Sequence, residues 1–285
     1  MKFSKLFAIA TAVALVYASA SIALAQGSHL QKRSITKTDK FEFGAGGTVA
    51  IVGAPKGSIT VSGGLTNEIE VTAVINLEAG SEADLARLAL VTGFITDESV
   101  TRTGVISIGT HDKSALKKLD KKFPKHLMGL PFSIDYVITV PRYCDLEIDG
   151  GKGDVSISGV EGAIRVNLIE TNGKIDVIGG SLSATVGIGS LDVSMGVRGW
   201  RGRTANIQIA TGKLTVRLPA NTSAEIDAVI LRTGSIENSL ADLKPRDRKA
   251  LFTEKSVLAK AGVGGPSLKF TVGDGILKLE RLQVS

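Results

Sequence analysis

The residues whose type and spacing could do chemistry are two aspartates, Asp176 in "TNGKIDV" (171–177) and Asp192 in "IGSLDV" (188–193). Each follows a glycine by three positions, within short phrases of the same form. If the two phrases stack as neighbouring strands, the carboxylates lie roughly 5 Å apart. Such a pair could cleave a glycosidic bond by acid and base catalysis, or hold Ca²⁺. We favour the alternative of two solvated surface carboxylates, because their repulsion in water is small.

Little else in the chain favours catalysis. The three histidines, His29, His111 and His126, form no H-E-x-x-H motif, and one cysteine cannot build a zinc site. We therefore expect no cofactor, no catalytic residue, and no metal ion unless Asp176 and Asp192 hold one. Cys144 lies in the strand-like "VPRYCDLEI", which predicts a buried, unreactive thiol.

Two basic segments could bind an anionic surface. "DKSALKKLDKKFPKH" (112–126) and "RGWRGR" (198–203) supply the candidate residues Lys117, Lys118, Lys121, Lys122, Trp200, Arg201 and Arg203. The expected partner is an anionic envelope component, either a lipid headgroup or a glycan, or another envelope protein. For the first segment we favour the alternative of a solvated loop, because runs of charge are often no more than that. Trp200 could equally pack over a gap between strands. An exported protein is not expected to bind nucleic acid.

The beginning of the chain has the pattern of an export signal. Lys2 and Lys5 precede an apolar run, and Ala23-Leu24-Ala25 forms an A-x-A cleavage site. We expect cleavage before Gln26 and a periplasmic, cell-surface or secreted protein with no transmembrane span. The run is also long enough to remain as an uncleaved anchor. Of the formal charge of +6, Lys2 and Lys5 contribute two, so the mature chain is only mildly basic.

A repeated phrase organises the rest of the 285 residues. A glycine is followed by apolar residues two and four positions later, with a polar residue between them, except that Asn238 stands at the fourth position after Gly234. The glycines are Gly57, Gly153, Gly173, Gly189, Gly212, Gly234 and Gly275. Strict alternation indicates strands with one buried face, and glycine before each strand permits a turn with positive φ.

The spacing of these phrases indicates stacked repeats. Successive glycines from 153 to 234 are about twenty residues apart, which leaves room for one further strand in each repeat. Segments 181–187, 204–210 and 223–230 alternate in the required way. We therefore predict an all-β fold, a β-solenoid (β-helix) of short stacked strands. A β-sandwich is the alternative, because it also has short strands at regular spacing.

The segments "GGKGDVSISGVEGAIRVNLIETNGKIDV" and "TGKLTVRLPANTSAEIDAVILRTGSIEN" resemble the bacterial putative-adhesin family of unknown function. The resemblance covers about residues 44–285. It implies a right-handed β-solenoid, frequent export and no established catalytic residues. The adhesin label of that family rests on analogy of fold.

The expected organisation is a signal peptide (1–25), a partly mobile N-terminal segment (26–43) and one solenoid domain (44–285). Residues 81–92 predict one short amphipathic helix with a capping box from Ser81 to Asp84, covering an open end of the sheet. Residues 243–260 predict an exposed charged loop with a helical turn.

The expected function is a non-catalytic binding, adhesion or scaffold module at the cell envelope. The alternative is a carbohydrate-active enzyme, a polysaccharide lyase or glycosidase.

Overall fold

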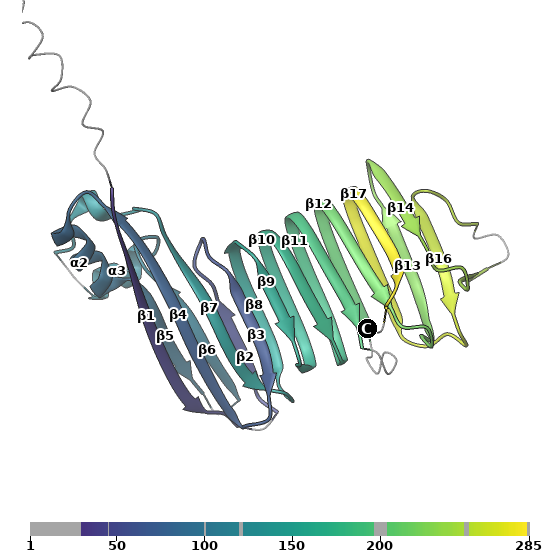
Figure 1. The fold of residues 1–285 in the computed structure, drawn as a ribbon, viewed down its shortest axis with the longest axis horizontal. Coiled ribbons are helices and arrows are strands. Elements are labelled where there is room, and N and C mark those ends of the chain that lie inside the picture. Colours follow the sequence, from purple (N-terminus) through teal and green to yellow (C-terminus); the bar gives the residue numbers. More distant parts are fainter. Residues whose placement is uncertain are drawn as a thin grey trace, which may run out of the picture.

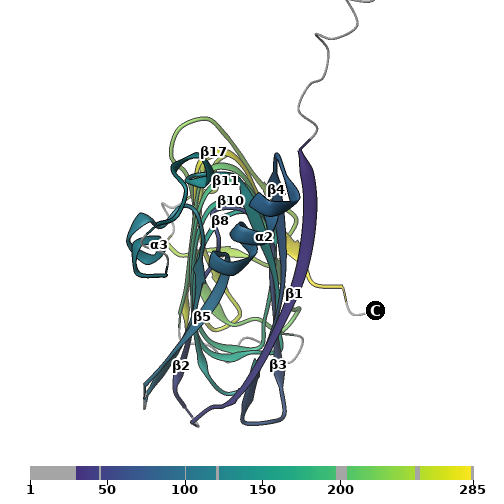
Figure 2. The same cartoon turned by 90° about the vertical axis from the view of Figure 1, so that its left-hand side faces the viewer.

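The computed structural model describes residues 30–44, 46–99, 101–119, 122–196, 204–247 and 251–283. Seventeen strands in these ranges form one open sheet, and most of them lie side by side along the long axis of the molecule (Figure 1). The sheet folds over into two facing walls. Viewed from the N-terminal end, the walls enclose a narrow interior (Figure 2). The fold is therefore all-β, as predicted.

Four long strands run through both walls, β10 (Glu161–Val177), β11 (Gly179–Met195), β12 (Thr204–Leu218) and β17 (Ser267–Arg281). The first wall also holds β5 (Gly93–Glu98), β6 (Arg102–Ile108), β2 (Thr48–Val52), β8 (Asp145–Lys152), β13 (Ala224–Ile230), β16 (Ser256–Ala261) and β15 (Lys244–Pro245). The second wall also holds β1 (Gln31–Glu42), β4 (Glu68–Ala79), β7 (Phe132–Pro141), β3 (Ile59–Gly64), β9 (Val155–Ser158) and β14 (Gly234–Asn238).

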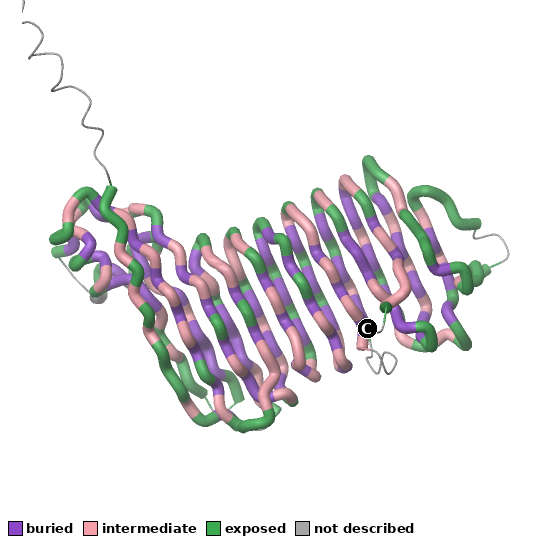
Figure 3. Tube along the Cα trace, viewed as in Figure 1, coloured by how far each residue is buried: buried purple, intermediate pink, exposed green. Residues whose placement is uncertain are grey.

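Neighbouring repeats pair in parallel and in register. Leu182 of β11 lies beside Ile164 of β10 and Ala205 of β12, and the parallel pairing continues through both walls. Parallel stacking of this kind is what a solenoid requires, whereas the strands of a β-sandwich are antiparallel. The expected inward residues of 181–187, 204–210 and 223–230 are all buried. Figure 3 shows the alternation of buried and exposed residues along the strands.

Glycines line one edge of the stack, where the chain bends between the walls, and we call this the glycine edge. Gly57, Gly153, Gly189, Gly212, Gly234 and Gly275 all have φ between +125° and +147° there. A Cβ atom on Gly212 would lie 1.7 Å from the carbonyl oxygen of Gly189 in the next repeat. The repeated glycine therefore serves both the turn and the close stacking of repeats.

The order of repeats in space differs from their order in the chain at both ends. β2 pairs with β6 and β8, and β3 pairs with β7 and β9, so the first repeat lies between two later ones. The last strand, β17, lies between β12 and the pair β13 and β14. Near each end, therefore, two repeats that are successive in the chain are separated in the sheet by a segment distant in sequence.

Antiparallel strands and a helix cover the N-terminal end of the stack. Helix α2 (Glu82–Val91) begins after Ser81, whose hydroxyl accepts from the backbone N–H of Asp84 at 3.2 Å, so the predicted cap is confirmed. Figure 2 shows α2 at this end, over the space between the walls, and its Leu85 and Leu88 are buried. The N-terminal segment extends this end, because β1 pairs along its whole length with β4. The sheet thus includes residues 31–42, ahead of the expected start at 44.

Two other expectations about secondary structure are corrected. The basic segment is helical where a loop was the alternative, with α3 (Lys113–Leu119) and the 3₁₀ turn η1 (Lys125–Leu127). The insert at 243–260 contains strands β15 and β16, which pair with each other. β16 also pairs with β13, because alternating Val257, Ala259 and Ala261 give it a buried face. Among the described residues, no helix is long and apolar enough to cross a membrane.

Candidate binding surfaces

The two candidate aspartates do not occupy equivalent positions. Asp192 lies beside Lys174 of β10, whereas Asp176 lies beside Ser194 of β11. The expectation failed because Gly173 of "TNGKIDV" does not occupy the turn position that Gly189 occupies in the next repeat. Thr171 is the register partner of Gly189, so Gly173 stands two residues further along the strand. A slip of two residues leaves the buried and exposed faces unchanged, and alternation alone could not reveal it.

Each aspartate has a cationic neighbour. Asp176 Oδ2 lies 3.5 Å from Lys174 Nζ, and Asp192 forms an ion pair with Arg217 of β12. Arg217 Nε also lies 3.4 Å from Glu280 Oε2 of β17, so its guanidinium connects three repeats. The hydrogen bond to Asp192 raises the pKa of Arg217. These pairs make the second wall a surface of alternating charge that favours the observed register.

A cavity of about 610 Å³ lies beside these pairs, lined by Lys174, Ser194, Arg217, Ser239, Glu280 and Arg281 among others. Neither Asp176 nor Asp192 lines it. Acid and base catalysis on a sugar needs two carboxylates that face one substrate, and these two face cations instead. No three His, Cys, Asp or Glu side chains within the described part of the chain are grouped to hold a metal ion.

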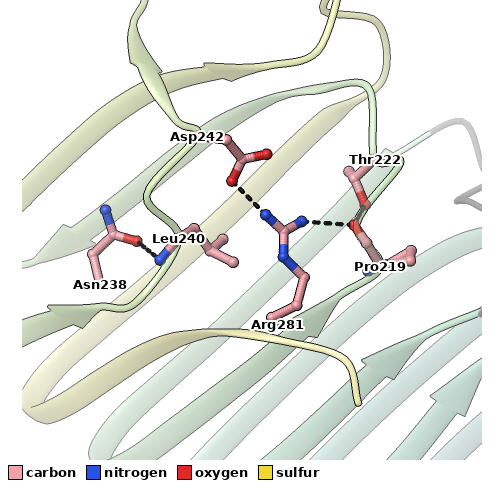
Figure 4. Close-up of polar contacts among 6 residues, drawn as sticks. All are labelled: Pro219, Thr222, Asn238, Leu240, Asp242 and Arg281. Atoms are coloured by element: carbon pink, nitrogen blue, oxygen red, sulfur yellow. Dashed lines mark hydrogen bonds and ion pairs between the residues drawn. The ribbon is translucent and has the colours of Figure 1, made fainter. Parts of the chain in front are cut away.

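Arg281 beside this cavity fastens the inserted last strand (Figure 4). Its guanidinium donates to the carbonyl oxygen of Pro219 at 3.1 Å and forms an ion pair with Asp242. Pro219 follows β12 and Asp242 follows β14, which are the two strands that flank β17 in the second wall. Arg281 therefore has a structural role, joining the two sides of the gap that β17 fills.

The basic segment presents its lysines from a packed base. Leu116, Phe123 and Leu127 are buried, while Lys117 and Lys122 are exposed. Figure 2 shows α3 outside the stack, on the side of β2 and β5. The backbone of Lys118 lies in α3. Lys121 lies outside the described residues, as do Trp200, Arg201 and Arg203 of the second basic segment and the whole of the signal segment 1–25.

Cys144 is buried at 2% exposure, as the sequence predicts. Burial is the main cause that raises the pKa of its thiol to about 12, and the nearby charge of Asp145 adds to it. A thiol that stays protonated at neutral pH is a poor nucleophile. Cys144 is therefore a packing residue.

The outer face of the first wall is a feature that the sequence analysis missed. Across β10, β11, β12 and β17 its outward positions are mostly hydroxyls and amides, including Asn167, Ser183, Thr185, Asn206, Gln208 and Thr271. The corresponding positions of the second wall carry the ion pairs described above. The signal was present in the sequence, because these are the residues between the inward positions of segments 181–187 and 204–210.

The chain resembles solved bacterial structures at low sequence identity. No family model matches the chain, and no curated protein matches it. A structure from Clostridium sporogenes, described as a putative cell adhesion protein, is 13% identical, with a TM-score of 0.45 over 88% of this chain and 100% of that one. A putative adhesin from Bacteroides fragilis is 12% identical, with a TM-score of 0.35 over 87% of this chain and 97% of that one.

Proposed function

We propose that the chain is an exported, non-catalytic β-solenoid that binds an anionic component of the cell envelope through the lysines of segment 113–125. The observation that carries the proposal is how these lysines are held. Three buried apolar side chains anchor the segment, while Lys113, Lys117 and Lys125 are exposed. Cations presented together beside apolar residues suit a surface of anionic headgroups or acidic glycan.

Export is the second part of the proposal and is supported by the sequence pattern of residues 1–25. Fractionated cells are expected to contain a mature chain that starts at Gln26. N-terminal sequencing of the exported form tests this, and a chain that still starts at Met1 contradicts cleavage. We also take the coil of the chain to be right-handed, as the family resemblance implies.

Sedimentation with vesicles tests the binding surface. The mature protein should sediment with vesicles that contain phosphatidylglycerol and stay in solution with vesicles of phosphatidylcholine alone. Binding should weaken between low and physiological salt, because exposed charges are screened over about 8 Å at that ionic strength. The double variant Lys117→Glu with Lys125→Glu should lose most of the binding.

A matched control separates this segment from general positive charge. Lys213 and Lys244 are also exposed, and Lys213→Glu with Lys244→Glu changes the net charge by the same amount. The control should sediment like the wild type. Equal loss in both double variants would mean that overall charge, rather than segment 113–125, attracts the protein to the vesicle.

A further inference from the structure

An apolar trough runs across the strands at the glycine edge of the first wall, close to the start of α3. Its larger part has a volume of about 530 Å³ and is lined by Val52, Pro55, His111, Gly151, Leu168 and Ile169 among others. A second cavity of about 210 Å³ shares Pro55 and His111 with it and continues to Leu130 and Phe132. The two cavities therefore adjoin and form one elongated depression.

The trough crosses several strands in register. Val52 lies beside Asp149, Asp149 beside Asn167, and Asn167 beside Thr185. With strands about 4.8 Å apart, these four positions span roughly 14 Å, and the second cavity lengthens the trough further. Exposed apolar side chains stand along it, with Ile169 at 61% and Val52 at 40% exposure. The trough therefore matches a long, thin apolar ligand.

The backbone of the trough favours a hydrocarbon over a peptide. Gly53 N–H donates to the Asp149 carbonyl oxygen at 2.8 Å, and Lys152 N–H donates to that of Pro55 at 3.0 Å. Gly57 N–H is likewise taken, by the carbonyl oxygen of Lys152. A bound peptide strand needs free backbone partners, which these groups no longer offer. An acyl chain needs none.

The polar side chains at the trough do not conflict with an apolar ligand. The Asp149 carboxylate already accepts from the Asn167 amide at 2.8 Å. His111 lies over the ring of Phe132, with centroids 5.4 Å apart, and burial lowers the pKa of its imidazole. At neutral pH the histidine is therefore uncharged.

A cation lies where the two cavities meet. Lys56 lines the smaller cavity and is exposed. His111 is followed within two residues by α3, which carries the exposed Lys113 and Lys117. An anionic group at the end of an acyl chain would be attracted to this corner.

We propose that this trough binds the acyl chain of a single-chain anionic amphiphile, with the anionic headgroup beside Lys56 and the lysines of α3. The placement of the headgroup rests on the proposed function, in which the same helix binds anions, whereas the apolar trough stands independently of it. The proposal adds to surface attachment a site for one lipid molecule.

The test uses the mature protein and a fluorescent polyene fatty acid, cis-parinaric acid, titrated below its micelle concentration. Saturable binding is expected from the wild type. Ile169→Glu places a charge in the trough and should weaken binding at least tenfold. Leu231→Glu is the matched control, because Leu231 is 63% exposed and does not line either cavity. That control should bind like the wild type, and both variants should melt like it.

Three results would overturn the proposal. The first is the absence of saturable binding by the wild type, and the second is equal affinity in Ile169→Glu and the wild type. The third concerns the headgroup, because the uncharged methyl ester of the same fatty acid should bind at least threefold more weakly. Equal affinity for acid and ester would remove the headgroup from its place at Lys56. Vesicle sedimentation of Ile169→Glu separates this site from the proposed function, which predicts that the variant still sediments.

Discussion

The α-carbon of Gly212 faces the carbonyl oxygen of Gly189 so closely that a methyl group on it would lie 1.7 Å from that oxygen. Gly275 stands in the same relation to Gly212, and Gly234 to Gly275. Real side chains do not approach a carbonyl oxygen to that distance. The repeated glycine is therefore a requirement of stacking as well as of the turn, and it explains why the same phrase recurs along the chain.

Replacement of one glycine at this edge should cost stability. Gly212→Ala forces a side chain into φ of +141° and against the neighbouring carbonyl group, and should lower the free energy of unfolding by at least about 2 kcal/mol. Gly80→Ala is the control, since a Cβ there meets nothing within 4 Å. It should be neutral or slightly stabilising. Urea denaturation of both variants decides the matter, and equal midpoints would contradict the account of the glycine edge.

Much of the repeat architecture could be predicted from the sequence. Alternation identified Ile175, Leu191 and Leu214 as inward residues, and all three are buried. Alternation fixes the face of a residue but not the register of a strand, because any slip by two residues preserves the face. For this reason the sequence placed Asp176 and Asp192 in one column, whereas the structure separates them by two positions.

Inward and outward positions of one phrase should respond differently to substitution. Ile175→Asp buries a carboxylate without a partner and should cost more than about 4 kcal/mol, enough to unfold or aggregate the protein. Asp176→Asn removes only a partly exposed ion pair with Lys174 and should change stability by less than about 1 kcal/mol. Thermal melting curves of the two variants test this. Similar losses in both would show that the assignment of faces is wrong.

The order of the repeats could not be predicted from the sequence. Every repeat has the same alternation of buried and exposed residues along its strands, so the local sequence pattern does not determine which repeats are neighbours. The position of β17 depends instead on contacts such as that of Arg281 with Pro219 and Asp242, which join residues distant in the chain. The site at the glycine edge was missed for a similar reason, since Val52, His111 and Ile169 come from three separate segments.

Thr171 occupies the turn position that glycine holds in the neighbouring repeat. It is 3% exposed, and its hydroxyl is buried without a hydrogen-bond partner. Thr171→Val keeps the shape and removes the unpaired group, so it should raise stability by about 1 kcal/mol. Thr222→Val is the contrasting variant, because the Thr222 hydroxyl donates to the Pro219 carbonyl oxygen at 2.8 Å. That variant should be less stable than the wild type, and a melting temperature raised in both or lowered in both would contradict this reasoning.

The thiol of Cys144 should be protected until the protein unfolds. Burial raises the pKa of this thiol to about 12, so it stays protonated at pH 8, and its 2% exposure also hinders a reagent. The native protein should react with Ellman's reagent orders of magnitude more slowly than the variant Cys144→Ala with Thr211→Cys, which carries an exposed thiol. In urea the wild type should react rapidly. Reaction of native Cys144 within tenfold of the exposed control would contradict its burial.

The raised pKa of Cys144 also predicts how stability depends on pH. Because the unfolded thiol ionises at lower pH than the native one, its ionisation should leave stability unaffected below about pH 8 and should lower it as pH rises toward 12.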